Sequence, residues 1–245
     1  MFYLRSCRNV APFLYLAEIF KLHTMALLSE IIYNIKNLRD GGTESDDSKL
    51  TRAQLEFIVN HFRAEIAGQR TNQNKALDGF YQELENVKLK STKDFRPTNK
   101  DVIILKSIDQ IPSPIVGHDN GYVLQTVGLR DEFLGFQPSS VHTFNIDLEN
   151  QYVQSIYFVV DNYVYIATKS YNPIREVFIR GVFENPRQVI YSQTGGENLL
   201  LGYDWEYPYP TGLLSQLNSL TINNEYRWMN MFPADVTNNN RDDKQ

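Results

Sequence analysis

The residues whose types could support catalysis lie together near the end of the chain, in the run Asp204-Trp205-Glu206-Tyr207-Pro208. Carboxylates beside aromatic rings are the side chains that glycoside hydrolysis uses, because one acid protonates the leaving oxygen while a second carboxylate acts on the sugar. That chemistry needs paired carboxylates, one of which has a raised pKa. The alternate positions before this run hold Leu200 and Gly202, which supply no further carboxylate.

The run resembles the end of the active-site motif of family 18 chitinases, in which the glutamate protonates the glycosidic oxygen and the preceding alternate positions are also acidic. Since those acids are missing here, we predict that Glu206 is not catalytic. The chain also lacks the eight βα units of a barrel enzyme. A carbohydrate-binding or glycoside-hydrolase-like protein that uses residues 204–208 is the alternative hypothesis. The simpler interpretation is a Trp/Tyr cluster that anchors the helix that follows.

Other reactive side chains form no recognisable group. The histidines at positions 23, 61, 118 and 142 lack the spacing of metal ligands, and the single cysteine, Cys7, excludes an internal disulfide and a cysteine-based metal site. Ser192 is not part of a nucleophile elbow, and no Lys-Ser/Thr follows the nearby glycines as in a phosphate loop. We therefore expect no catalytic residue, no cofactor and no metal.

Charge and hydropathy exclude two further classes of protein. The net charge of -5 argues against a nucleic-acid-binding surface, which needs clustered Lys and Arg. The apolar segment 10–22 is interrupted by Glu18 and Lys21 and is too short to span a bilayer, so we expect no membrane contact. A signal peptide is a second interpretation of this segment, although no small-residue cleavage site follows. Met25 opens an amphipathic pattern, so residues 1–24 are predicted to be a leader of uncertain status.

The strongest helix signal begins at Thr51. Thr51 and Gln54 match a capping box, in which each side chain satisfies a backbone donor of the other residue. The apolar residues that follow recur with helical spacing and form one stripe: Leu55, Ile58, Phe62 and Ile66. The opposite face carries Arg52, Glu56, Asn60 and Arg63, for which plain solvation and a specific role are both open. Helical spacing also predicts helices over residues 25–38, 74–86 and 213–232.

Residues 152–183 carry the strongest β signal, because β-branched and aromatic side chains dominate them. Asp161-Asn162 tolerates positive φ and predicts a tight hairpin. With the alternating residues 175–183 the pattern predicts a three-stranded antiparallel meander. Residues 102–106 and 122–127 predict further strands, and residues 187–191 a short extension.

Together these patterns predict an α+β fold, in which the N-terminal helices and the C-terminal helix form a bundle and an antiparallel β domain is inserted. We divide the chain into residues 1–24 (leader), 25–99 with 204–233 (helical bundle), 100–203 (β domain) and 234–245 (polar C-terminal arm).

The order of several short motifs resembles the virion ring proteins of crAss-like bacteriophages and, more distantly, the tail tubular protein A of T7-like phages. The motifs are Lys106-Ser-Ile-Asp-Gln-Ile-Pro, Val164-Tyr-Ile, Arg180-Gly-Val-Phe-Glu-Asn-Pro, the Trp-Glu-Tyr-Pro run at residue 205, and Pro233-Ala-Asp-Val-Thr-Asn-Asn-Asn. The resemblance covers most of residues 25–240.

The resemblance implies a head-to-tail connector: a structural protein without catalytic activity that forms a ring, usually twelve-fold, beneath the portal. Its expected partners are copies of itself, the portal protein and adjacent neck or tail rings, and the genome passes through without specific binding. Such a protein is made in the host bacterial cytoplasm and ends in the neck or tail of the virion. A tail-fibre or receptor-binding module fits less well, because it would not have a helical N-terminal half.

The candidate assembly interface combines charged residues with the apolar end of the last helix: Arg63, Arg180, Met231, Phe232, Pro233 and Val236. Arg180 is a charge in an otherwise apolar strand, so it needs a partner or water; a lone surface arginine is the alternative. The polar residues 234–245 have too little apolar content to fold alone and are predicted to be an assembly arm, with a frayed terminus as the alternative.

Overall fold

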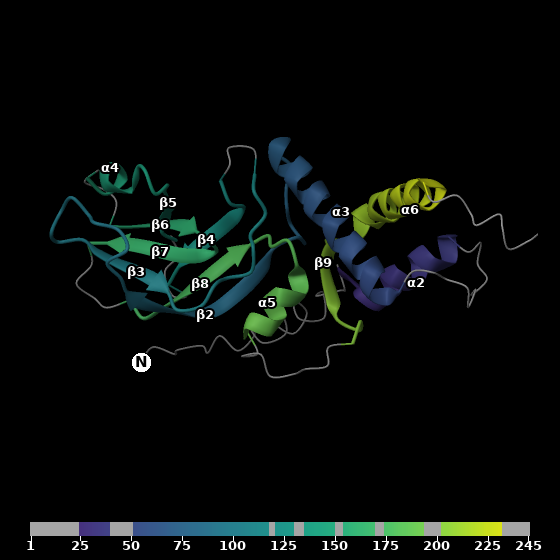
Figure 1. Cartoon of the computed structure of the whole chain (residues 1–245), viewed down its shortest axis with the longest axis horizontal. Coiled ribbons are helices and arrows are strands. Elements are labelled where there is room, and N and C mark those ends of the chain that lie inside the picture. Colours follow the sequence, from purple (N-terminus) through teal and green to yellow (C-terminus); the bar gives the residue numbers. More distant parts are fainter. Residues whose placement is uncertain are drawn as a thin grey trace, which may run out of the picture.

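The elements of the protein gather into two lobes, one of helices and one of strands (Figure 1). The computed structural model describes residues 25–39, 51–117, 121–129, 135–149, 154–169, 174–193 and 202–231, with the main chain alone at Arg39 and residues 225–231. The C-terminal helix contacts both N-terminal helices, as predicted. The α+β class is therefore confirmed.

The helical lobe contains three helices and a two-stranded sheet. The helices are α2 (Leu28–Arg39), α3 (Arg52–Asn72) and α6 (Leu214–Met231), and antiparallel strands β1 (Met25–Leu27) and β9 (Glu206–Pro210) form the sheet. A short 3-10 turn, η1 (Thr211–Leu213), leads into α6. The capping box is confirmed: the N–H of Gln54 donates to Thr51 Oγ1 at 3.2 Å, and the N–H of Thr51 donates to Gln54 Oε1 at 2.8 Å. One apolar core joins all these elements.

The second lobe is a seven-stranded sheet in the order β4-β8-β2-β3-β7-β6-β5. Its strands are β2 (Gln82–Ser91), β3 (Ile103–Ser107), β4 (Leu124–Gly128), β5 (Gln137–Pro138), β6 (Ser155–Val160), β7 (Tyr163–Thr168) and β8 (Glu176–Gly181). Neighbours are antiparallel except β5 and β6, which are parallel, so the sheet is mixed and not wholly antiparallel as predicted. The N–H of Phe136, beside β5, donates to the carbonyl of Val127 in β4 at 2.6 Å. The two edges therefore meet, and the sheet is nearly closed.

The predicted hairpin is confirmed, but the three-stranded meander is wrong. Asp161 and Asn162 have φ of 51° and 62°, which is the conformation of a tight two-residue turn between β6 and β7. β8 pairs with β2 and β4, and β2 and β3 separate it from β7. Alternation identified β8 as a strand, but it carries no information about which strand lies beside it.

Two local predictions are also wrong, and one strand was not predicted. The residues predicted as a helix over 74–86 form a turn, in which Gly79 has φ of 84°, and the first half of β2. The segment 187–191 belongs to helix α5 (Pro186–Gln193) instead of extending the sheet. Residues 206–210, for which no strand was predicted, form β9. The division of the chain at residue 100 stays a prediction, although β2, which lies within residues 25–99, belongs to the larger sheet.

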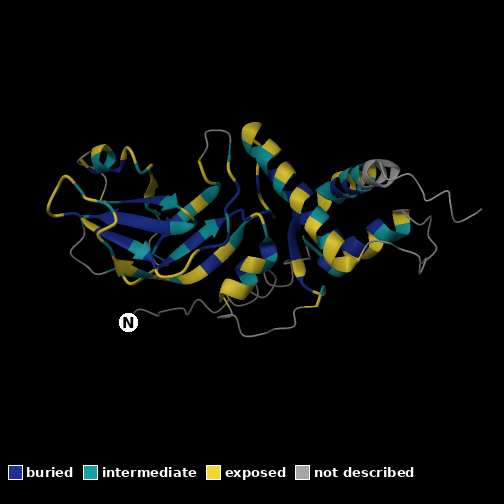
Figure 2. Ribbon diagram, viewed as in Figure 1, coloured by how far each residue is buried: buried dark blue, intermediate teal, exposed yellow. Residues whose placement is uncertain are grey.

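The sheet has a core on each face. The inner core includes Leu84, Val127, Ile166 and Ile179 from four different strands. On the outer face, helix α4 (Phe144–Glu149) covers an aromatic cluster that consists of Phe95, Phe144, Phe158 and Tyr165. Figure 2 shows the buried residues concentrated inside the sheet and where the two lobes meet.

A salt bridge borders the aromatic cluster. Lys106 Nζ lies 3.0 Å from Asp94 Oδ2, and the ammonium group stands over the ring of Tyr163 at 4.3 Å from its centroid. The hydrogen bond from Lys106 lowers the pKa of Asp94, with smaller contributions from Thr92 and Tyr165. The salt bridge therefore joins the segment between β2 and β3 to β3 itself.

Candidate functional site

The most unusual polar residue of the protein is Arg63, which lies on α3 between the two lobes and has 0% of its surface exposed. Its guanidinium donates three hydrogen bonds to main-chain carbonyls: Nε to Pro208 at 2.8 Å, Nη1 to Phe183 at 2.7 Å and Nη2 to Phe80 at 2.7 Å. Phe80 precedes β2, Phe183 follows β8 and Pro208 lies in β9. One side chain thus holds the two segments that flank β2 and β8 of the larger sheet and strand β9 of the helical lobe, and we call this arrangement the Arg63 clamp.

The clamp holds a buried positive charge without a carboxylate among its three hydrogen-bond partners. Burial lowers the pKa of Arg63 to about 10, which leaves the guanidinium charged at neutral pH. Carbonyl dipoles satisfy its donors, and the rings of Phe80 and Tyr207 lie beside it, each centroid 5.9 Å from Cζ. Charged donors make stronger hydrogen bonds than neutral ones, so three of them compensate much of the desolvation.

Two further polar contacts reinforce the clamp from the same face of α3. The hydroxyl of Tyr207 donates to Asn60 Oδ1 at 2.8 Å, and both groups are buried. Arg187 on α5 binds Glu56 through both carboxylate oxygens, with Nε at 2.6 Å from Oε1 and Nη2 at 2.9 Å from Oε2. Both oxygens are engaged and both side chains are largely covered, which is the geometry in which an ion pair contributes most to stability.

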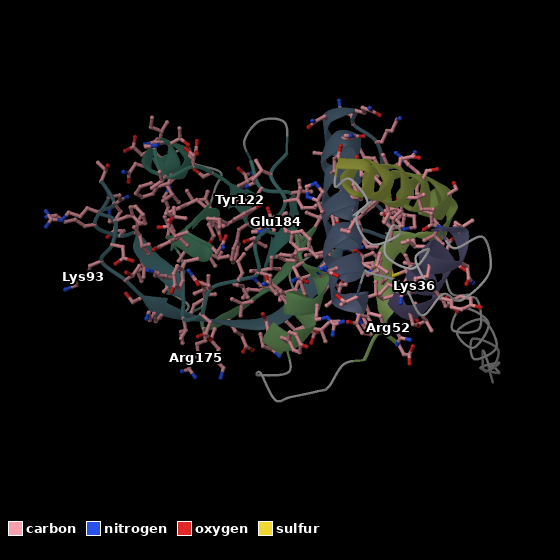
Figure 3. The ribbon with its side chains drawn as sticks, turned by 45° about the vertical axis from the view of Figure 1, so that its right-hand side comes forward. Lys36, Arg52, Lys93, Tyr122, Arg175 and Glu184 are labelled. Carbon is pink, nitrogen blue, oxygen red and sulfur yellow. The ribbon has the colours of Figure 1, made fainter. Side chains whose placement is uncertain are left out.

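This arrangement corrects one interpretation of the sequence. On the face of α3 for which solvation was one of two open interpretations, solvation is wrong for Glu56, Asn60 and Arg63. Arg52 is exposed and lies at the surface near the start of the helix (Figure 3). The only available signal was that Glu56, Asn60 and Arg63 share one face, at spacings of four and three residues. Exposed helices show the same spacing, so the signal could not separate a buried polar junction from a solvated face.

The carboxylates of residues 204–208 lie on the outer side of β9. Asp204 and Glu206 are exposed, while Trp205, Tyr207 and Tyr209 alternate with them and are buried in the core of the helical lobe. The rings are therefore unavailable for stacking against a sugar. The structural interpretation is confirmed: these aromatics pack with Leu217 of α6, and the hydroxyl of Tyr209 donates to the carbonyl of Leu213.

Of the six predicted interface residues, the structure describes the side chains of Arg63 and Arg180 and the main chain of Met231. Arg63 has no exposed surface with which to contact another chain. Arg180 lies on the outward side of β8, with 43% of its side chain exposed, 3.8 Å from Glu83 Oε1 and over the ring of Tyr81. Met231 ends α6 and is described by its main chain alone. Phe232, Pro233 and Val236 lie outside the described residues, as do Cys7, His23 and His118.

Within the part of the chain that the structure describes, no three His, Cys, Asp or Glu side chains come together in a way that could hold a metal ion. Nor does any described helix combine the length and the apolar character needed to cross a bilayer. His61 lies on the outer side of α3, edge-to-face with Phe62.

The polar residues that the fold gathers around Arg63 join the two lobes, so their role is structural. Comparison with protein families is consistent with a structural protein: residues 30–244 match the family described as phage tail ring protein 2. The chain belongs to this family of crAss-like phages, and the resemblance of its motifs to phage ring proteins is confirmed. The comparison with curated proteins finds no match.

Proposed function

We propose that the protein forms a ring in the phage neck, between the portal and the tail, through which the genome leaves the head. Membership of a tail ring family supports a virion structural role. The observation that carries the finer assignment is the Arg63 clamp, because it fixes the orientation of the sheet relative to the helices. A connector needs that property, since each subunit must present one lobe to one neighbouring ring and the other lobe to the next.

In this proposal the helical lobe packs against the portal or neighbouring subunits, and the β lobe faces outward or toward the adjacent ring. The ring contains twelve copies. The net charge of -5 suits a conduit, because a surface that bound phosphates tightly would retard the DNA. The protein is made in the host cytoplasm and acts in the virion without contact with a membrane.

A reconstruction of the virion tests this proposal directly. We expect twelve copies of the chain around the tail axis, placed between portal and tail, with both lobes fitting the density in the relative orientation described above. If the chain lies in a fibre, it is not a connector. If it lies at the distal tip of the tail, the proposed position is wrong, and another copy number would contradict the twelve-fold ring.

Charge reversal at Arg180 is expected to weaken assembly more than folding. The pair with Glu83 is half-exposed, so Arg180→Glu should lower the free energy of unfolding by no more than about 1 kcal/mol. The Arg180 side chain is 43% exposed, so a neighbouring chain can reach its guanidinium group. Incorporation should be measured as copies per particle, in a phage that lacks its own copy of the gene and is supplied with the variant.

The matched control for this experiment is Arg175→Glu, which reverses an exposed arginine just before the same strand (Figure 3). We expect Arg180→Glu to reduce incorporation severalfold relative to Arg175→Glu. Equal incorporation of the two variants would make Arg180 a lone surface arginine.

Deletion of residues 234–245 tests the proposed assembly arm, which includes Val236 and follows the apolar residues Met231, Phe232 and Pro233. A segment that becomes ordered only on contact adds affinity through its high local concentration within a ring, so its loss should reduce incorporation and leave the melting temperature unchanged. A scrambled segment of the same composition is the control. Truncated protein that enters particles at the wild-type level would identify these residues as a terminus without a role.

A further inference from the structure

The outward side of α3 carries a large aromatic residue in water. Phe57 is 73% exposed, the highest exposure among the large apolar residues of the described chain. Counted from Ala53, the residues Phe57, His61, Ala64 and Gly68 follow at offsets of four, eight, eleven and fifteen and share one side of the helix. Ala53 and His61 are exposed, whereas Ala64 and Gly68 are half-buried. We call these five residues the outer face of α3; it is about 22 Å long and has no Asp, Glu, Lys or Arg. A solvated helix face normally carries such charges.

Gly68 gives a second, independent observation on the same face. Glycine inside a helix is less favourable than alanine by about 1 kcal/mol, and Gly68 lies well inside the 21 residues of α3. A Cβ at this position meets no heavy atom within 4 Å, so the surroundings of Gly68 within the chain do not require glycine. Close approach of another backbone would require it, because glycine is the residue that permits such contacts.

We infer that the outer face of α3 is one of the two surfaces through which neighbouring copies of this chain contact each other in the ring, with Phe57 as its aromatic anchor. This inference rests on the proposed function, since it needs a closed ring. A cyclic ring uses heterologous contacts, so every subunit presents two different surfaces to its two neighbours. The outer face of α3 carries an exposed phenylalanine and no Asp, Glu, Lys or Arg, which fits the centre of a protein interface, where aromatic anchors are enriched and such charged residues are depleted.

The position of α3 supports the assignment. The helix crosses the middle of the molecule between the two lobes (Figure 1), and its inner side is held by the Arg63 clamp. The surface is therefore presented on a rigid element, which limits the entropy lost on association. A face of about 22 Å by 10 Å is smaller than the ~800 Å² that a standard interface buries on each partner, so α3 supplies the centre and other elements the rim.

Other surfaces and another class of partner fit less well. Ile146 is 64% exposed, but it lies on α4, a helix of only six residues, which offers a much shorter face than α3. Tyr33 and Leu38 are exposed on α2, but five positions on a helix place them about 140° apart, on different sides. Nucleic acid would require clustered cations, whereas Lys36, Arg52, Lys93 and Arg175 are spread over both lobes (Figure 3).

The molecule that contacts the outer face of α3 can be identified by placing the photoreactive amino acid benzoylphenylalanine at position 57 of the full chain and irradiating assembled particles. We expect a product in which position 57 is joined to a second copy of the chain, through a peptide other than the one around residue 57. The same label at position 146 is the control and should give at least tenfold less of this product. A crosslink from position 57 to its own chain, such as to residues 1–24, or to a different protein would overturn the inference.

Substitution provides the second arm of the test. Phe57→Glu should leave the melting temperature unchanged, because the side chain is exposed, and should reduce incorporation into particles at least tenfold, as expected for the loss of an anchor residue. Ile146→Glu is the matched control and should be incorporated normally. If wild-type chains form the ring and Phe57→Glu forms it equally well, the inference fails and the proposed function stands. If wild-type chains form no ring in the particle, the proposed function fails with it.

Discussion

Replacing Arg63 by methionine should lower the free energy of unfolding by about 3 to 5 kcal/mol, because three buried main-chain carbonyls lose their hydrogen-bond donor. Methionine fills a similar volume but donates no hydrogen bond, so the carbonyls of Phe80, Phe183 and Pro208 lose a buried partner. Each such carbonyl costs about 1 to 3 kcal/mol, and the removal of a desolvated charge offsets part of the sum. Urea unfolding followed by circular dichroism measures the difference.

Two further substitutions act as controls. One keeps the charge of Arg63 but changes its geometry, and the other makes the same arginine-to-methionine change at an exposed position of the same helix. Arg63→Lys keeps the charge but cannot reach three carbonyls with a planar fork, so it should recover less than half of the loss. Arg52→Met removes an exposed arginine from the same helix and should change stability by less than about 0.5 kcal/mol. If Arg63→Met and Arg52→Met unfold at the same urea concentration, the clamp does not stabilise the fold.

Replacing Phe158 by alanine should have an effect of similar size, about 3 to 5 kcal/mol, because it removes a buried aromatic ring and leaves a cavity. Phe158 is 2% exposed, lies between 5.3 and 5.4 Å from the ring centroids of Phe95, Phe144 and Tyr165, and fixes α4 to the sheet. Amide hydrogen exchange should therefore accelerate first in residues 144–149.

The matched control for this second prediction is Phe57→Ala, which removes the same side chain from an exposed position. Its effect on the stability of the isolated chain should be below about 0.5 kcal/mol. Equal losses for the two alanine variants would mean that the aromatic cluster does not hold α4 in place.

The parts of the fold that were predicted from sequence depend on neighbours in the chain. The capping box of Thr51 and Gln54 is local, and so is the turn at Asp161-Asn162, where both residues adopt positive φ. Helices α3 and α6 each have one apolar stripe that must be buried, and the simplest way to bury both stripes is to pack the two helices against each other. That packing is what the structure contains.

The segment 74–86 was misread because a bulge imitates helical spacing. Asn86 has φ of 56°, and the pairing of β2 with β8 shifts between Leu84 and Val87. The extra residue brings Leu84, Val87 and Leu89 onto the same inner face. A first step of three residues is typical of a helix, so periodicity alone favoured the wrong element.

The candidate site was predicted least well, because its residues act over long sequence separations. Arg63, on the helix face opposite the apolar stripe, was predicted to be an interface residue. Its true partners are carbonyls up to 145 positions away, and any residue type can supply a carbonyl. Phe57 lay in a predicted helix but was not selected as a candidate. The sequence alone does not show whether an apolar residue next to an apolar stripe is buried by other elements or exposed.

The separations spanned by Arg63 also imply an order of folding. Its partner at Phe80 lies 17 positions away, whereas those at Phe183 and Pro208 lie 120 and 145 away. Closing the longest of these loops costs roughly 2 kcal/mol more entropy than closing the shortest. All seven strands of the larger sheet lie between Phe80 and Phe183, so that sheet can form while the chain ends are still apart.

Contacts that form late, after the rate-limiting barrier, mainly slow unfolding and have little influence on the folding rate. We therefore expect the Arg63 contacts to form late in folding and to lengthen the lifetime of the finished subunit. In a virion this kinetic persistence matters more than rapid folding, because a particle is assembled once and its subunits are not replaced before it reaches a host.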